Sequence, residues 1–408
     1  NVKSENLTVI VGGGAAGMAA ALVLAEAGAD CVLLERNDRL GRKLSATGNG
    51  QGNITNTDMG PHRYFSGDNG RVGQVLSAFG KDDLIGFLTS LGGYFIADEE
   101  GRVYPSSRQA SSVTDLLRFA LETYGANVRT GEFVRSAEKR GGLFSVKTDG
   151  AVYTSRFLIL AAGGKASPHF GTDGNGYRLA QSFGHSVTRL SPALVQLKTD
   201  KENIRGLKGV RCDCGLRLLR EEQERFSCRG DVIFTDYGVS GNAVFRASSY
   251  AEAGDFLSLD FLPDCPREKL AELLGGKAEK FGAYPAEDLL RGIVNSAAAK
   301  CVLRSLGISL QESCASLRRR AGSIAARVKN FSLRVEGNMG FENAQVTKGG
   351  VPLSETDEYL MSKKAEGLFF AGEILDVDGE CGGYNLQWAF SSGVRCARRI
   401  AELLHEDR

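Results

Sequence analysis

A glycine pattern near the start of the chain limits its fold more than any other feature. Gly12, Gly14 and Gly17 follow an apolar run at residues 7–11 and open a small-residue segment at 15–27. These two segments and a second apolar run at 31–35 predict a strand, a helix and a parallel strand. Such a glycine turn lets backbone N–H groups approach a pyrophosphate, while an acidic residue about 20 positions later accepts ribose hydroxyls. Glu35 stands there, so we predict a Rossmann-type dinucleotide domain; the alternative is a glycine turn that binds nothing.

The composition of the chain indicates which kinds of partner it can bind. The chain has 408 residues, 50 basic and 49 acidic, and this net charge of +1 provides no electrostatic footprint for nucleic acid or membrane. We therefore expect a small-molecule substrate and leave the oligomeric state open. Nine scattered cysteines favour a reduced, cytoplasmic protein. The spacing of Cys212, Cys214 and Cys228 does not match a zinc pattern, so we expect no metal.

The pattern along the chain predicts an α/β fold with two insertions. Short alternating runs between residues 193 and 265 indicate an antiparallel β-barrel-like domain. Residues 266–335 have helical composition and indicate a small helical domain. The flanking segments, 1–192 and 336–408, are expected to form one dinucleotide-binding domain.

Two further segments favour FAD over NAD as the cofactor. A basic, glycine-rich loop at residues 41–50 suits the pyrophosphate and the face of a flavin. Near the C-terminus, a strand, an acidic loop and a helix start at residues 367–388 suit the ribityl chain and the negative charge at the flavin N1/O2 edge. The predicted cofactor-binding residues are Gly12, Gly14, Ala15, Ala16, Gly17, Glu35, Arg36, Arg42, Lys43, Thr47, Gly48, Asn49, Gly50, Ala162, Gly163, Gly164, Gly372, Glu373, Asp376, Gly383, Tyr384, Asn385 and Leu386.

These motifs carry a family resemblance. Together with Gly101–Pro105, Phe234-Thr235, Gly238-x-Ser240-Gly241 and Thr347-x-Gly349-Gly350-Val351, the glycine turn and the two flavin segments resemble the bile-acid-inducible-N-like flavoproteins, also called the aminoacetone oxidase family. The resemblance implies an FAD domain, an inserted β-barrel-like domain and a small helical domain. It also implies mixed activities, because one branch reduces C=C bonds of oxo-bile acids and another oxidises small amines. Asp236 stands where the family commonly has a histidine.

Five side chains are candidates for substrate chemistry. Tyr384, beside the predicted flavin edge, is the first candidate for a proton source; the alternative is packing against the cofactor. Asp236 and Ser240 are candidates for orienting or protonating a substrate, or they hold a loop. Arg102 and Tyr104 are candidates for binding a carboxylate or carbonyl, or Arg102 is a hairpin arginine in solvent.

The leading hypothesis is an FAD-dependent oxidoreductase. We expect NAD(P)H to dock transiently and reduce a non-covalent FAD, which then reduces an activated C=C bond of a small, steroid-like substrate. No second dinucleotide fingerprint provides a nicotinamide domain. One alternative is a flavin oxidase of a small amine, and another is a flavin-binding sensor without turnover.

Overall fold

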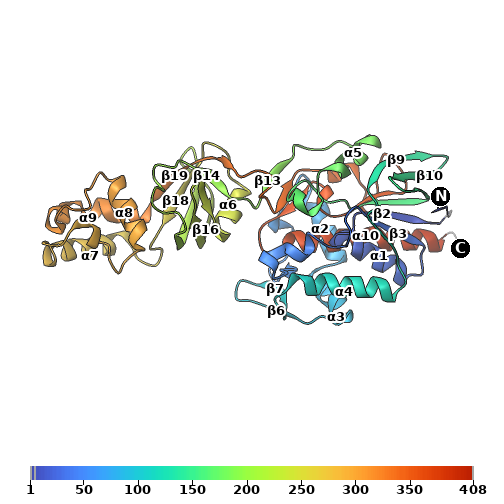
Figure 1. Cartoon of the computed structure of the whole chain (residues 1–408), viewed down its shortest axis with the longest axis horizontal. Helices are drawn as coiled ribbons and strands as arrows, with labels where there is room; N and C mark the ends of the chain where they lie inside the picture. Colours follow the sequence, from blue (N-terminus) through green and yellow to red (C-terminus); the bar gives the residue numbers. More distant parts are fainter. Residues whose placement is uncertain (1, 4–5, 407–408) are drawn as a thin grey trace. The chain divides into compact units, whose positions relative to one another are not determined.

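The chain forms two compact units, each with its own hydrophobic core (Figure 1). The computed structural model describes residues 2–3 and 6–406. Residues 1–192 and 345–408 make up the first unit, and residues 193–344, green-yellow to orange in Figure 1, make up the second.

The centre of the first unit is a sheet of five parallel strands. In spatial order the strands are β21 (Leu368–Phe370), β12 (Phe157–Leu160), β2 (Thr8–Val11), β3 (Cys31–Glu35) and β8 (Asn127–Thr130). Every residue of β2, β3, β12 and β21 is buried, as expected for strands covered on both faces. Because the strands run the same way, all their carboxyl ends lie along one edge.

Helices cover this sheet. The helices of the first unit are α1 (Ala15–Glu26), α2 (Asn69–Ala78), α3 (Lys81–Ser90), α4 (Ala110–Thr123), α5 (Asn175–Ser182) and α10 (Tyr384–Glu406). Helix α1 packs against α4 and, most extensively, against α10. The approach to α10 is close, because a Cβ added at Gly393 would lie 2.3 Å from the carbonyl oxygen of Ala16. A larger residue at position 393 would therefore push the two helices apart.

Smaller sheets surround this core. One contains β1 (Val2–Lys3), β11 (Val152–Ser155), β10 (Leu143–Thr148) and β9 (Val134–Arg140). A second contains β4 (Thr55–Asn56), β7 (Arg102–Pro105) and β6 (Phe95–Ala97). Two strand pairs complete the unit: β22 (Val377–Gly379) with β5 (Tyr64–Ser66), and β13 (Ser191–Ala193) with β20 (Val346–Lys348).

The second unit combines a closed barrel with helices. The barrel order is β14 (Leu197–Thr199), β17 (Gly238–Ser240), β16 (Gln223–Phe234), β15 (Arg211–Arg220), β18 (Phe256–Asp260) and β19 (Phe331–Asn338). All its neighbouring strands are antiparallel. The helices are α6 (Asn242–Ser248), α7 (Arg267–Lys280), α8 (Ser296–Ser305) and α9 (Ala321–Lys329).

The α/β fold with a Rossmann-type domain, an antiparallel barrel and helices is confirmed. Strand β19, which closes the barrel, was not predicted, because residues 331–335 fell within the helical domain predicted at 266–335. Its residues alternate between buried and exposed from Phe331 to Glu336, which is the strand pattern, but the basic helical run before it hid the change of period. Barrel and helices also share one hydrophobic core. The four-part domain division stays a prediction.

Candidate functional site

The carboxyl edge of the parallel sheet gathers four predicted cofactor-binding segments. Residues 12–17 follow β2, residues 35–36 end and follow β3, residues 162–164 follow β12, and residues 372–373 follow β21. Ligands of open parallel sheets bind outside the carboxyl ends of the strands. The topology therefore brings together segments that are more than 350 positions apart in sequence.

The glycine turn has the geometry of a phosphate cradle. Gly12 has φ +109°, and a Cβ there would lie 2.3 Å from the carbonyl oxygen of Ala161. A Cβ at Gly17 would lie 1.8 Å from the carbonyl oxygen of Gly12. At Gly14, in contrast, a Cβ would meet no atom within 4 Å, and no side chain caps the N-terminus of α1 that begins there. The fold thus needs two of the glycines for packing and leaves free space at the third, in front of the first N–H groups of α1, which no described side chain caps and which suit a pyrophosphate.

Glu35 is held at the end of β3 by three hydrogen bonds. Its carboxylate accepts from the backbone N–H of Gly13 (2.8 Å), the backbone N–H of Asn37 (2.8 Å) and the Nδ2 of Asn37 (2.7 Å). Arg42 donates through Nη1 to the Oδ1 of Asn37 at 3.0 Å. Arg36 pairs with Asp173 at 2.9 Å. The acidic residue is therefore fixed next to the glycine turn, with two of the predicted basic residues nearby.

A basic cavity of about 460 Å³ lies beside this cluster. It is lined by Arg39, Arg42, Ser45, Ser111, Asp115, Arg118 and Phe170. Arg42 thus connects the cavity, through Asn37, to Glu35.

A second network ties the basic loop to the loops after β12 and β21. Lys43 Nζ lies 2.8 Å from Oε2 of Glu373, and Oε1 of Glu373 accepts the backbone N–H of Thr347 at 2.8 Å. The hydroxyl of Thr347 accepts the N–H groups of Lys165 (2.8 Å) and Ala166 (2.9 Å). A Cβ at Gly164 would lie 2.5 Å from that hydroxyl oxygen. Lys43, Gly164 and Glu373, all predicted from sequence, therefore lie within one polar network.

The loop at residues 47–50 bends sharply. Gly48 and Asn49 both have left-handed backbone angles, with φ +58° and +53°. The hydroxyl of Thr47 donates to the carbonyl of Leu44 at 2.7 Å, and residues 48–50 are exposed. This geometry leaves the loop's backbone groups accessible at the surface.

The segment before α10 places Tyr384 inside the unit. Its side chain is only 4% exposed, and its ring packs edge-on against Tyr64 with centroids 6.1 Å apart. The hydroxyl of Tyr64 donates to the carbonyl of Tyr384 at 2.7 Å. Asn385 binds both backbone groups of Gly379, each at 2.8 Å. Gly383, Asn385 and Leu386 are partly exposed, whereas Tyr384 is buried; its role, as a proton source or as a ring packed against the cofactor, stays a prediction.

The remaining catalytic candidates lie on strand β7, which pairs with β4, or in the other unit. Arg102 pairs with Asp98 (2.8 Å) and Glu100 (3.0 Å) of its own hairpin. Tyr104 is buried under the guanidinium of Arg108, 4.3 Å from the ring centroid. Asp236 and Ser240 lie in the second unit, where Lys208 pairs with Asp236 at 2.9 Å and lowers the pKa of that exposed carboxyl. Their roles in the reaction stay predictions.

Two charged residues at this edge were missed from the sequence. Asp378 in β22 is 1% exposed, and Lys348 in β20 lies 3.2 Å from its Oδ2. Burial raises the pKa of Asp378 to about 6, although the Lys348 ammonium opposes the rise. Burial also raises the pKa of the neighbouring Asp376. Nothing in the local sequence marks Lys348 or Asp378, because their pairing joins two strands 30 positions apart in the chain.

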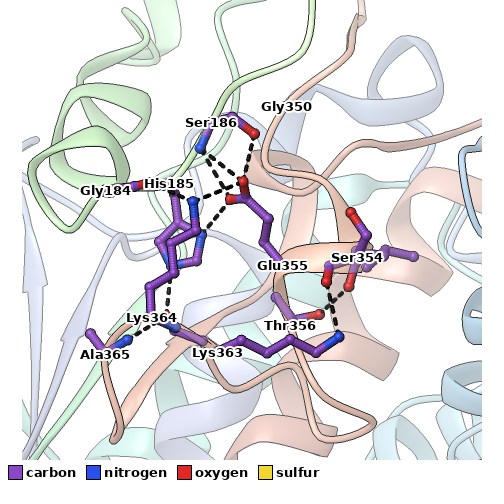
Figure 2. A network of polar contacts seen from close by, with 12 residues as sticks. Gly184, His185, Ser186, Gly350, Ser354, Glu355, Thr356, Lys363, Lys364 and Ala365 are labelled. Carbon is purple, nitrogen blue, oxygen red and sulfur yellow. Dashed lines mark hydrogen bonds and ion pairs between the residues drawn. The ribbon is translucent and has the colours of Figure 1, made fainter.

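A buried histidine network braces the approach to β21 (Figure 2). His185 Nδ1 lies 2.7 Å from Glu355 Oε2, and its Nε2 lies 2.6 Å from the hydroxyl of Ser362. That hydroxyl accepts the N–H groups of Lys364 (3.0 Å) and Ala365 (2.9 Å), so its own proton is left to donate to Nε2. Nδ1 then carries the ring proton and donates to Glu355. Burial lowers the pKa of His185, which keeps this ring neutral at pH 7.

Within the described ranges, no group of three or more His, Cys, Asp or Glu side chains is placed to hold a metal ion. Nor does any helix among the described residues have the length and apolar character needed to cross a membrane.

Comparison with known proteins agrees with this architecture. The chain is 35% identical to the 3-dehydro-bile acid delta(4,6)-reductase of Clostridium scindens, over 96% of this chain and 98% of that protein. It is 30% identical to the ribosomal RNA dihydrouridine synthase of Escherichia coli, over 96% of this chain and 97% of that protein. The fold, the residues at the carboxyl edge of the parallel sheet and these relatives together define a flavin-dependent oxidoreductase. The chain belongs to the HI0933-like Rossmann-domain family, whose model matches residues 6–399, and the resemblance to the bile-acid-inducible-N-like flavoproteins is confirmed.

Proposed function

We propose that the chain binds FAD non-covalently along the carboxyl edge of the parallel sheet. The free space at Gly14 and the uncapped start of α1 fit a pyrophosphate, and the fixed carboxylate of Glu35 fits the adenosine ribose. The partly exposed residues 12, 14, 162, 163 and 383 fit a cofactor that passes along this edge toward α10. Bound FAD would supply hydride chemistry that no side chain provides.

We further propose that the reaction is the reduction of a C=C bond conjugated to a carbonyl, in a small steroid-like molecule, with NAD(P)H as the electron source. The observation that carries this proposal is the match to the bile-acid reductase, which extends over nearly the whole length of both chains. The chain's own residues would hold and orient the cofactor. Glu35 and the glycine turn would bind its adenosine end, and the Lys43–Glu373–Thr347 network would fix the loops near its flavin end.

Anaerobic mixing tests the direction of the reaction. We expect NADH or NADPH to bleach the flavin of the purified holoprotein, and a 3-oxo steroid with conjugated double bonds to restore its colour with a product heavier by two hydrogens. If the flavin stays oxidised with both nucleotides but is bleached by a small amine, the result would contradict the reductase hypothesis and favour an amine oxidase. Bleaching by no donor would support a sensor.

A second candidate follows from the relative named as a ribosomal RNA dihydrouridine synthase. Dihydrouridine is uridine with a saturated carbon–carbon bond next to a carbonyl, so the same class of reduction would act on a base in RNA. The assay is the dihydrouridine content of ribosomal RNA incubated with the holoprotein and NAD(P)H. RNA reduction without steroid reduction would favour this second candidate.

A further inference from the structure

Lys348 and the buried Asp378 form an ion pair to which the proposed cofactor binding assigns no role. Lys348 Nζ lies 3.2 Å from Oδ2 and 3.5 Å from Oδ1 of Asp378. The ammonium also lies 3.8 Å from the centroid of the Phe65 ring, on the strand that pairs with the one carrying Asp378. Lys348 is thus held from two sides, by a carboxylate and by an aromatic face.

The two partners differ in exposure. Asp378 is 1% exposed, whereas the side chain of Lys348 is 31% exposed. A buried carboxylate is costly unless a cation compensates it, and Oδ2 of Asp378 receives no hydrogen bond from the described residues. The carboxylate therefore holds the ammonium on its buried side, while part of the lysine side chain stays exposed.

The position of Lys348 follows from its neighbour in β20. Thr347 donates its N–H to Glu373 and accepts the N–H groups of Lys165 and Ala166. Lys348 follows Thr347 in β20, and its partner Asp378 lies near enough to Glu373 for that carboxylate to raise the pKa of Asp378. The positive charge of Lys348 is therefore close to the loop after β21, where we place the cofactor.

We propose that Lys348 is a catalytic residue that stabilises the negative charge on the carbonyl oxygen of the acceptor, and that Asp378 is the positioning residue that holds it. This inference rests on the proposed reduction of a conjugated C=C bond. Reduced nicotinamide supplies one hydride, that is one proton with two electrons, by way of the flavin. The hydride bonds to the carbon β to the carbonyl, the C=C π electrons move onto the carbonyl oxygen as an enolate, and a solvent proton then bonds to the α carbon.

An ammonium fixed before the reaction stabilises this oxyanion better than water does, because it needs no reorganisation as the charge develops. The charged groups that act on Asp378 are Lys348, Asp376 and Glu373. With its pKa at about 6, Asp378 is mainly ionised at neutral pH and releases its hold on Lys348 as the pH falls below that value. The reaction with the acceptor should therefore slow on the acid side of pH 6 in the wild type.

The test compares Lys348→Met with the control Lys363→Met, which removes an exposed lysine that donates to the Ser354 carbonyl. We expect both variants to retain FAD and to be reduced by NAD(P)H at wild-type rates. Reoxidation by the acceptor should fall about 100-fold or more in Lys348→Met alone. Asp378→Asn should lose the acid-side change in reoxidation that the wild type shows near pH 6.

A readout without turnover uses 4-fluorophenol as an oxyanion mimic, with ¹⁹F NMR reporting its binding and ionisation. The wild type and Lys363→Met should bind the phenolate and lower the pKa of the bound phenol, and Lys348→Met should not. Absence of phenolate binding to the wild type, or equal binding and reoxidation in both lysine variants, overturns the inference. Failure of the proposed function would give a different result, namely no flavin reduction or no acceptor turnover in the wild type. The phenol experiment tests whether Lys348 stabilises an oxyanion in either case.

Discussion

The substitution Gly14→Ala separates cofactor binding from folding at the glycine turn. Gly14 has φ −83° and ψ −168°, an extended conformation that alanine adopts without strain, and the added methyl group would meet no atom within 4 Å. Restricting the unfolded chain stabilises the variant by about 0.4–1 kcal/mol. Alanine is a poorer helix N-cap than glycine, which costs roughly 0.5–1 kcal/mol. The two effects nearly cancel, so the free energy of unfolding should stay within about 0.5 kcal/mol of the wild type.

FAD binding should respond differently, because the methyl group occupies the space where we place the pyrophosphate. We expect FAD affinity to fall at least tenfold, or about 1.4 kcal/mol. The assay pairs urea unfolding of the FAD-free protein with titration of FAD by its fluorescence. Gly17→Ala is the contrast, since its Cβ would lie 1.8 Å from the Gly12 carbonyl oxygen and should destabilise the fold itself. Unchanged FAD affinity in a folded Gly14→Ala protein would refute the placement of the pyrophosphate.

Three further outcomes follow from the structure. Burial alone would raise the pKa of Glu355, but hydrogen bonds from Ser186, Lys364 and His185 outweigh it and lower the pKa to about 2. The ionised carboxylate therefore stabilises the fold above pH 4.5, and this stabilisation is lost as the pH falls toward 2. The difference in unfolding free energy between the wild type and Glu355→Gln, measured by urea unfolding, should shrink over this range. Ser362→Ala leaves two backbone N–H groups and a histidine nitrogen without their partner and should cost about 1–3 kcal/mol in the same assay, whereas the exposed control Ser354→Ala should cost almost nothing. Trp388 is the single tryptophan and donates through Nε1 to the carbonyl of Gly372 at 3.1 Å, so FAD should quench its fluorescence; constant emission on saturation with FAD would contradict a flavin near this edge.

Local patterns in the sequence were sufficient for the central sheet. The expected strand at 31–35 coincides with β3, and the helix expected at 15–27 is α1 at Ala15–Glu26. Buried parallel strands are continuous apolar runs bounded by glycines, a signal that needs no knowledge of distant residues. Strand β19 was missed because it follows a helical run and pairs with strands far away in sequence.

The relative positions of the predicted site residues could be inferred from the sequence only where the residues belong to one local structural motif. The glycine turn and Glu35 belong to one βαβ unit, so their proximity follows from local structure. The partnership of Lys43 with Glu373 spans 330 positions and depends on the order of the strands in the sheet. Lys348 and Asp378 were not singled out because nothing in their local sequence shows that one is buried and the other is its counter-ion.

The late position of β19 also has a consequence for how the second unit folds. Leu259 of β18 pairs with Phe331 of β19, so the barrel cannot close until the whole helical segment between them has brought its ends together. Closing so long a segment is entropically unfavourable while it is unstructured, and the cost falls once α7, α8 and α9 have compacted it. Helix formation should therefore precede barrel closure, and amides at the β18–β19 seam should gain protection from hydrogen exchange after those of the helices.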